Sequence, residues 1–549
     1  MFLAVFLLGA AAAAAGASAS VPITLGGVLA SHRVDFASFG WEMWNMLNSY
    51  LLPGALTDAR LVRASQGLAP ATIRVGGITG DWLRYTDDDS SAAGAAGAAP
   101  GLGSFWPTAP QNFSYANFSS LVSFVRASNY SLMFMLSELY GRDCQQPVPG
   151  CPSCDKQWCV GAWDTSNVRA FLQHVHDEKL LQPGDSFELG NELVGHLPAS
   201  NTTDDIKQLA VMLDEIWADV PAAARPRLYA PSTDACGNPA QLQIMANITG
   251  FPRVAGFTFH AYPGQSGEGA NALIDILTNA TWLRTQIMRG SEAFMCIDAW
   301  QAGPQAANLE LLVTESSSSW NLPLPPPAQN SFLNGFFTIA ELGQCVSAPA
   351  AAGGGALSSP PACARASPFH PAALLFAPRR YAATGVSLVA RWAFSENSPF
   401  GTVIFNETSK QWDAAHDYFI LRAHKSVVGP AVLAVSGDEA SDVLVYAYCG
   451  QARNGSVVIA AANPSLADVD LTFGSVPAAP RAALVFTAPG GNLSSTTPLL
   501  NGGEPLRLAA DGTPPAMPAA FVAAGDAVTV PARSQAFFVL LAAGLPACM

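Results

Sequence analysis

The sequence predicts an α/β protein in which a (β/α)8 TIM barrel is followed by an all-β sandwich. Three observations carry this prediction: the length of 549 residues, a recurring alternation of apolar and helical segments, and a change of pattern near residue 425. One such barrel needs roughly 250 residues or more, so the chain has room for a second domain. We expect a leader at 1–19, the barrel at 20–424 and the sandwich at 425–549.

The barrel prediction rests on eight short apolar segments that are rich in β-forming residues. Stretches with helical periodicity, such as 204–220 and 330–342, lie between them. Strands that alternate with helices build a parallel sheet, and eight such units close a barrel. The expected strands, in chain order, are 33–40, 71–77, 131–136, 186–190, 227–232, 254–260, 309–315 and 386–392.

The last part of the chain contains short strands without helices between them. Segments such as "VLVYAYCG" and "SQAFFVLLAAG" are separated by Gly, Pro and Asn. This pattern is typical of a β-sandwich, and the stretch before Arg33 could add a strand to it. Low-complexity segments at 87–103, 321–327 and 347–362 predict loops.

The first residues have the features of a secretory leader. The apolar run "MFLAVFLLGAAAAAAGASAS" ends in Ala17-Ser18-Ala19, which fits an A-x-A cleavage pattern. A membrane anchor is the alternative, but the run is short for a span of roughly 20 residues. We therefore expect a secreted protein, in the extracellular space or in a lysosome- or vacuole-like compartment, with at most peripheral association with the cell surface or matrix.

Glycosylation signals and cysteines agree with export. Nine N-x-S/T sequons occur, which suits a secreted glycoprotein; they lie at Asn112, Asn117, Asn129, Asn201, Asn247, Asn279, Asn406, Asn454 and Asn492. The ten cysteines are an even number, so disulfides are expected in an oxidising compartment. Zinc is the alternative for one cluster, where a disulfide-stapled loop is favoured; its members are Cys144, Cys151, Cys154 and Cys159.

The charge balance excludes one class of partner. The net charge is −14, and no run of Lys and Arg occurs anywhere in the chain. Nucleic-acid binding is therefore not expected. Tight binding of a highly sulfated polyanion would need basic residues that cluster locally.

Two glutamates follow expected strands at the positions where barrel enzymes carry their active residues. Glu192 comes just after the fourth strand, in "DSFELGNELVGH", and Glu315 ends the seventh strand. Retaining glycosidases use two carboxyl groups about 5–5.5 Å apart, and for such a site we expect neither a cofactor nor a metal ion. Either glutamate alone would be read as a solvated strand end, but the pair favours a glycosidase site. Glu188, four residues before Glu192, is assigned a structural role.

Several segments together resemble glycoside hydrolase family 79, the heparanase-type enzymes. The segment 161–196, which ends in "FELGNELVGH", is similar to the family's W-E-L-G-N-E, and "LLVTESSSSW" (311–320) is similar to its E-T-S-S-A-Y. "IRVGGITGDWL" (73–83) and "FTFHAY" (257–262) resemble two further strand ends of the family, and "SQAFFVLLAAGLPACM" (534–549) resembles its closing strand. The resemblance runs in order over most of residues 33–549.

The resemblance implies roles for the residues around the two glutamates. Glu192 would be the proton donor and later the base, with a pKa raised by the nearby charge of Glu315, and Glu315 would be the nucleophile. Asn191 would hydrogen-bond the sugar 2-hydroxyl. Cys449 and Cys548 would form a disulfide.

Five further residues are expected to contact the substrate or to orient the nucleophile. For most of them a structural role is the alternative, as a core Tyr, a satisfied barrel His, a structural ion-pair Arg or an ordinary loop Asp. In the order of their expected roles they are Tyr262 beside the nucleophile, His260 on the floor of the cleft, Arg74 paired with Glu315, Asp81 as a substrate contact, and Trp320 as an aromatic sugar contact.

Two departures from the family concern the substrate. "NLPLPPP" stands where the family has a run of glycines, and "FSENSPFGTV" (394–403) replaces its G-x-G-N-Y. In the family these segments bind the uronic carboxylate. The expected substrate is still a carbohydrate, either a β-linked glucuronide or a glycan that contains glucuronic acid. An endo-acting heparan-sulfate-type glucuronidase and a non-catalytic carbohydrate-binding protein remain the alternatives.

Overall fold

A computed structural model describes most of the chain from Ala19 onwards. The described residues are 19–43, 54–88, 110–145, 158–193, 196–233, 239–263, 270–286, 309–318, 331–346, 386–395, 401–406, 408–438, 440–451, 455–474, 480–525, 527–541 and 543–549. The expected leader, except for Ala19, lies outside the described residues, as do almost all of the low-complexity segments.

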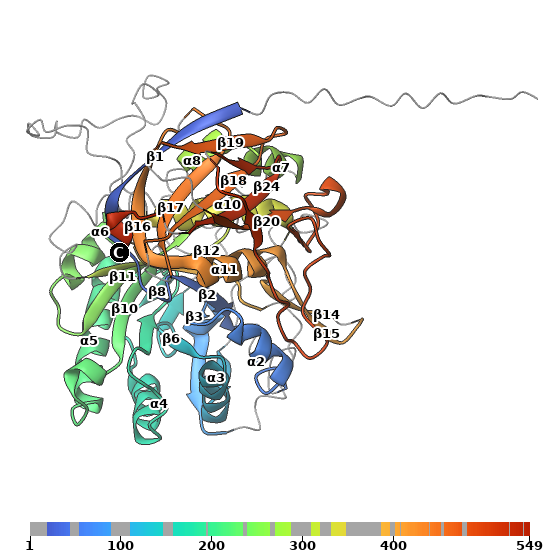
Figure 1. The fold of residues 1–549 in the computed structure, drawn as a ribbon. Helices are drawn as coiled ribbons and strands as arrows, with labels where there is room; N and C mark the ends of the chain where they lie inside the picture. Colours follow the sequence, from blue (N-terminus) through green and yellow to red (C-terminus); the bar gives the residue numbers. More distant parts are fainter. Residues whose placement is uncertain are drawn as a thin grey trace, which may run out of the picture.

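Eight parallel strands form a closed barrel, which confirms the predicted fold class (Figure 1). Each predicted strand is present, and only the first is displaced. It begins at Ala37 rather than at residue 33, because Arg33 turns back to pair with Asp35 at 2.8 Å. The strands are β2 (Ala37–Glu42), β3 (Ala71–Gly76), β6 (Tyr130–Leu136), β9 (Ser186–Leu189), β10 (Arg227–Thr233), β11 (Val254–Ala261), β12 (Glu310–Ser316) and β13 (Val386–Trp392).

The barrel interior changes from apolar to charged toward the carboxyl ends of the strands. A buried cluster of Met133, Tyr229, Leu312 and Leu388 fills part of the interior. Arg74 is also completely buried, although it carries a charge. A buried charge is costly unless it is paired, so its partners define the polar end of the barrel.

Helices and short hairpins surround the strands. Asp58 caps the first of these helices by accepting from the Arg60 amide, and Ser114 caps the next by accepting from the Asn117 amide. The helices are α2 (Ala59–Gln66), α3 (Tyr115–Ala127), α4 (Ser166–Asp177), α5 (Ala199–Ile216), α6 (Pro239–Ile248), α7 (Ala270–Leu277), α8 (Ala280–Gln286), α10 (Phe332–Val346) and α11 (His416–Val427). The hairpins or strand pairs are β4 (Leu83–Thr86) with β5 (Gln111–Ser114), β7 (Asp143–Gln145) with β8 (Trp158–Val160), and β14 (Val403–Asn406) with β15 (Gln411–Ala414). None of the described helices combines the length and apolar character that crossing a bilayer requires.

The second domain is a β-sandwich to which the start of the chain contributes. Its first strand, β1 (Ala19–Ser31), pairs in parallel with β19 through its first half and antiparallel with β16 through its second half (Figure 1). It therefore belongs to both layers and joins them. The other strands are β16 (Val428–Ser436), β17 (Leu444–Gly450), β18 (Val457–Asn463), β19 (Val469–Phe473), β20 (Arg481–Thr487), β21 (Leu499–Leu500), β22 (Ala520–Val522), β23 (Ala527–Val530) and β24 (Ser534–Leu540).

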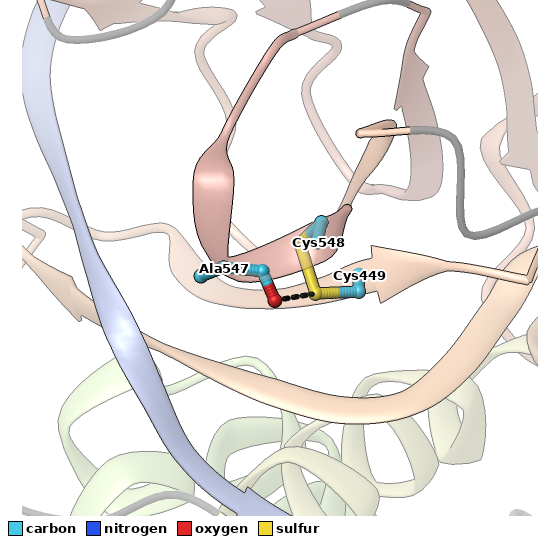
Figure 2. The surroundings of a disulfide bond; sticks show 3 residues. All are labelled: Cys449, Ala547 and Cys548. Carbon is cyan, nitrogen blue, oxygen red and sulfur yellow. Dashed lines mark hydrogen bonds between the residues drawn. A yellow bond between two sulfur atoms is a disulfide. The ribbon is translucent and has the colours of Figure 1, made fainter.

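A disulfide fastens the C-terminal residues to this domain. Figure 2 shows Cys449, on β17, bonded to Cys548, with the Ala547 carbonyl oxygen 3.5 Å from the Cys449 sulfur. The two cysteines are 99 residues apart in the chain. A cross-link of this kind typically stabilises a fold by about 2–4 kcal/mol. Cys159 is also disulfide-bonded, which favours the stapled loop over a zinc site.

Two helices connect the barrel to the sandwich. α10 packs against β18 and β24, among which it lies in Figure 1, and α11 packs against β16 and β24. His416, at the start of α11, shares a 2.6 Å hydrogen bond with Gln535 of β24, and Gln535 donates to the Phe332 carbonyl at 3.0 Å. Burial lowers the pKa of His416 to about 3. The interface therefore holds a neutral imidazole.

Acidification is expected to weaken this interface. Between pH 6.5 and about 3 the unfolded chain binds a proton at His416 that the folded chain does not bind, so stability falls as the pH falls through this window. The contribution lost from pH 7 to pH 5 is about 2 kcal/mol. Urea unfolding of the wild type and of His416→Gln at both pH values measures it. Parallel pH dependences in the two proteins would contradict this assignment.

Candidate active site

The two predicted catalytic glutamates lie together at the carboxyl ends of their strands. Glu315 is the penultimate residue of β12, and Glu192 lies three residues beyond β9. One carboxylate oxygen of each and a ring nitrogen of His260 all lie within 4.8 Å of one another. This separation is close to the 5–5.5 Å typical of retaining glycosidases and below the 6.5–9.5 Å typical of inverting enzymes.

A sharp turn carries Glu192 into this position. Glu192 has a φ of +55°, which is uncommon for a residue with a side chain, and its amide donates to the Ser232 carbonyl at 2.8 Å. Gly190 has a φ of +70°, and a Cβ there would lie 2.4 Å from Glu138 Oε2. The turn therefore needs glycine at 190. Strain of this kind, typically about 1–3 kcal/mol, is common at functional sites.

Arg74 organises the base of the site. Its Nε donates to Glu188 Oε2 at 2.7 Å, and its Nη1 donates to Glu315 Oε1. Its Nη2 donates to Asn191 Oδ1 and to Ser232 Oγ, both at 2.8 Å. Burial alone would lower the pKa of Arg74, but the charges of Glu188 and Glu315 outweigh it and raise that pKa. Arg74 is thus a fixed cation that orients the carboxylate of Glu315, and Glu188 is its second buried anion.

His260 bridges the two glutamates. Its Nδ1 lies 2.6 Å from Glu192 Oε1 and 3.5 Å from Glu315 Oε2, and its Nε2 lies 3.0 Å from Ser232 Oγ. Ser232 accepts from Arg74, so its own hydroxyl hydrogen is free to point at Nε2. In the neutral imidazole the proton is then on Nδ1, where it can be donated to Glu192.

Tyr262 contacts the second carboxylate oxygen of Glu315. Its hydroxyl donates to Glu315 Oε2 at 2.8 Å. Burial, together with the negative charges of Glu315 and Glu192, raises the pKa of Tyr262 well above its ordinary value. Tyr262 therefore stays protonated, and Arg74 and Tyr262 hold one oxygen of Glu315 each.

Asn191 is held in place by hydrogen bonds to Arg74 and Asp81. Because Arg74 can only donate, the Asn191 atom facing it is the oxygen, which leaves the amide nitrogen as a donor for a ligand. Asp81 is completely buried, and its Oδ2 accepts from the Asn191 backbone amide at 3.1 Å. Asp81 thus positions the loop that carries Asn191. Trp320 lies outside the described residues.

A second set of charges supports the end of β12, the strand that carries Glu315. Arg391 donates through Nη1 to the Ser316 carbonyl at 2.8 Å and pairs with Asp417 of α11 at 2.9 Å. Burial raises the pKa of Glu341 to about 7, although the neighbouring Ser316 hydroxyl and the charge of Arg391 oppose this shift. The backbone next to Glu315 is thus tied to α11, which packs against the sandwich.

Two residues of this region were missed in the sequence. Ser232 lies in an expected strand end but gives no signal alone, because it acts through Arg74 and His260. Glu42, at the end of β2, pairs in register with Gly76, and a Cβ on Gly77 would lie 2.0 Å from Glu42 Oε2. Its predicted strand ended at residue 40, so this strand-end carboxylate escaped notice.

Glu192, His260 and Glu315 also have the composition of a metal site, because each offers one ligand atom and these atoms lie within 4.8 Å of one another. A cation there would compete with the donors that already hold Glu315, Arg74 among them. The donor set therefore fits a hydrogen-bonded carboxyl pair better than a metal centre.

Two solved structures of glycosidases have a similar fold. The 4-O-α-L-rhamnosyl-β-D-glucuronidase of Fusarium oxysporum 12S matches with a TM-score of 0.60 at 13% identity, over 95% of this chain and 100% of that chain. The GH51 arabinofuranosidase of Xanthomonas axonopodis pv. citri matches with a TM-score of 0.60 at 14% identity, over 95% of this chain and 99% of that chain. These identities are low, so the two matches support the fold.

Sequence comparison is more specific. The chain is 24% identical over 484 residues to the hyaluronoglucuronidase of Hirudo nipponia. This alignment covers 84% of the chain and 85% of the relative. The model of the glycosyl hydrolase family 79 N-terminal domain matches residues 18–343, more than half of the chain. A glycosidase barrel with paired carboxylates at its mouth and this family match lead to one conclusion: the chain belongs to glycosyl hydrolase family 79 and is a glycosidase.

Proposed function

We propose that this protein is a secreted retaining β-glucuronidase that uses Glu315 as nucleophile and Glu192 as acid and base. The observation that carries the mechanism is the separation of at most 4.8 Å between the ligand atoms of the two carboxylates and His260. Carboxylates this close together leave no room for a water molecule between one of them and the sugar, as an inverting enzyme requires. Direct attack on the sugar by one of the carboxylates needs this shorter spacing.

In the first step Glu315 attacks the anomeric carbon while Glu192 protonates the glycosidic oxygen. The bond from that carbon to the leaving oxygen breaks, and an ester bond to Glu315 forms. The contacts from Arg74 and Tyr262 hold the carboxylate for attack along one direction. The Asn191 amide donates to the sugar 2-hydroxyl, and this bond strengthens in the oxocarbenium-like transition state.

In the second step water replaces the leaving group. Glu192, now deprotonated, removes a proton from water, whose oxygen attacks the anomeric carbon and releases Glu315. The sugar leaves with its original β configuration. His260 Nδ1, 2.6 Å from Glu192 Oε1, stays in contact with the Glu192 carboxyl group in both of its protonation states.

A glucuronide is proposed as substrate because two similar proteins are named as glucuronidases. They are the leech hyaluronoglucuronidase and the fungal rhamnosyl-glucuronidase. The glycone is tested with purified protein and two aryl glycosides that share one aglycone, a β-D-glucuronide and a β-D-glucoside. These sugars differ only at C6, where one carries a carboxylate. We expect kcat/KM to favour the glucuronide by about 100-fold or more.

Three readouts separate the parts of this proposal. Proton NMR should show the β-anomer of the product first, and an initial α-anomer would mean inversion. A preference for the glucoside would refute the glycone but keep the mechanism. Product sizes from hyaluronan separate an enzyme that cuts inside the polymer from one that cuts at its ends. If none of these substrates is cleaved, the protein does not have the proposed activity.

A further inference from the structure

The end of the barrel opposite to the active site contains a pocket that both polar and apolar residues line. It has a volume of about 470 Å³, within the range of about 300–1,000 Å³ that holds small ligands. It lies among the first residues of several strands, including Ala71, Tyr130, Arg227 and Glu310. Asn129 also lines it and is exposed. The site described above lies at the other ends of the same strands.

The charges of this pocket balance. Arg33 pairs with Asp35 at 2.8 Å and with Glu310 at 3.2 Å. Arg227 pairs with Glu310 at 3.1 Å. Two cations thus face two anions, so the lining favours neither an anion nor a cation. A neutral ligand with several hydroxyl or amide groups fits such a lining best.

Asn129 stands in an N-x-S sequon at the edge of this pocket. It occupies the turn between α3 and β6 with a φ of +59°, a conformation that Asn tolerates well. Other sequons differ: the amide nitrogens of Asn201 and Asn406 donate to Gly161 O and Asp413 Oδ2. Asn247 is exposed on α6 and does not line this pocket. Asn129 therefore combines a solvent-facing acceptor with a pre-formed pocket of mixed polar and apolar lining.

We propose that Asn129 carries an N-linked glycan whose first N-acetylglucosamine lies in this pocket. In the transfer, Nδ2 of Asn129 bonds to the anomeric carbon of a lipid-linked oligosaccharide, loses one proton and displaces the lipid pyrophosphate. The sugar then meets Gln182, Ser131 and Arg227 with its polar groups and Val34 and Pro70 with its apolar face. This inference rests on the secretion that is part of the proposed function, but not on the catalytic mechanism.

The glycan should stabilise the fold by binding the folded state alone. Ser131→Ala destroys the sequon and so prevents glycosylation of Asn129 while the asparagine itself stays. Both proteins are produced in a eukaryotic secretory host. An endoglycosidase that leaves one N-acetylglucosamine gives a trimmed wild type. We expect intact and trimmed proteins to have the same Tm, and Ser131→Ala to be lower by about 1–3 °C. Because the pocket is at the far end of the barrel, kcat/KM should agree within about twofold.

Two controls isolate the contribution of the pocket. Asn247→Gln removes an exposed sequon that does not line the pocket, and its Tm should not change. Wild type and Ser131→Ala produced without glycosylation should have equal Tm values, which shows that the serine hydroxyl itself is not responsible.

Glycopeptide mass spectrometry decides whether Asn129 is modified. Glycans at other sequons with none at Asn129 would refute the proposal. So would a glycan at Asn129 with an unchanged Tm in Ser131→Ala, because the sugar would then lie outside the pocket. If no sequon is modified in secreted protein, the inference fails, while glucuronide hydrolysis can still succeed in its own assay.

Discussion

Replacing Glu315 with Gln is expected to lower kcat by about 10⁴-fold or more, because the attacking carboxylate is lost while its shape remains. Arg74 and Tyr262 would still contact the amide, so the fold should persist. Replacing Glu192 with Gln should lower kcat by about 10²–10⁴-fold. The second loss should be smaller for aryl glycosides whose leaving groups need no proton. Steady-state kinetics with aryl and alkyl leaving groups measures both effects.

Added azide distinguishes the two roles. In Glu192→Ala, azide should replace water in the second step and give a β-glycosyl azide. In Glu315→Ala, azide should attack the sugar directly, with Glu192 protonating the leaving group, and give an α-glycosyl azide. The exposed Glu215→Gln serves as a control that should retain full activity. The opposite assignment of products would exchange the roles of the two glutamates, and full activity in either variant would remove that residue from the mechanism.

Replacing Arg74 with Met is expected to have the largest combined effect on stability and activity. It leaves the buried carboxylates of Glu188 and Glu315 without their shared cation. Loss of one member of a buried ion pair typically costs about 3–5 kcal/mol. The nucleophile also loses its orientation, so kcat should fall by about 100-fold or more. Urea unfolding and steady-state kinetics measure the two losses separately.

The double variant Arg74→Met/Glu188→Gln separates charge burial from catalysis. Removing the Glu188 charge should recover a substantial part of the lost stability, because one uncompensated anion disappears. Activity should stay low, because Glu315 is still unsupported. Recovery of both together would mean that Arg74 acts only through stability. An unchanged stability in the single variant would contradict the buried charge network.

The strands could be predicted because their residues are almost all buried. Apolar runs bounded by turn residues mark such strands directly, as in β3 and β13. Helix limits were harder to place. The helix expected at 204–220 begins at Ala199 and ends at Ile216. Its first residues are small and polar, and carry no apolar periodicity. The first barrel strand was misplaced because its start is decided by an ion pair at Arg33.

The site was predictable only where strand position and chemistry coincide. Glu192 and Glu315 follow apolar strands, and His260, Tyr262 and Arg74 could be named because their segments resemble known ones. Their distances come from the curvature of the barrel and the tilt of its strands, which no local pattern contains. For the same reason the role of Asp81 as a buried support for Asn191 could not be foreseen.

The pairing of β1 has a consequence for biosynthesis. Ala19–Ser31 would leave the ribosome early, but the strands that it joins, β16 and β19, follow roughly 400 residues later, or about 20–80 s at ordinary rates of translation. The barrel can therefore close while this segment waits for its partners. Folding quality control would then act on a nascent chain that carries an unpaired strand at its leading end. A chain cut between the two domains would keep that strand permanently unpaired, so expression of the barrel alone should begin after Ser31.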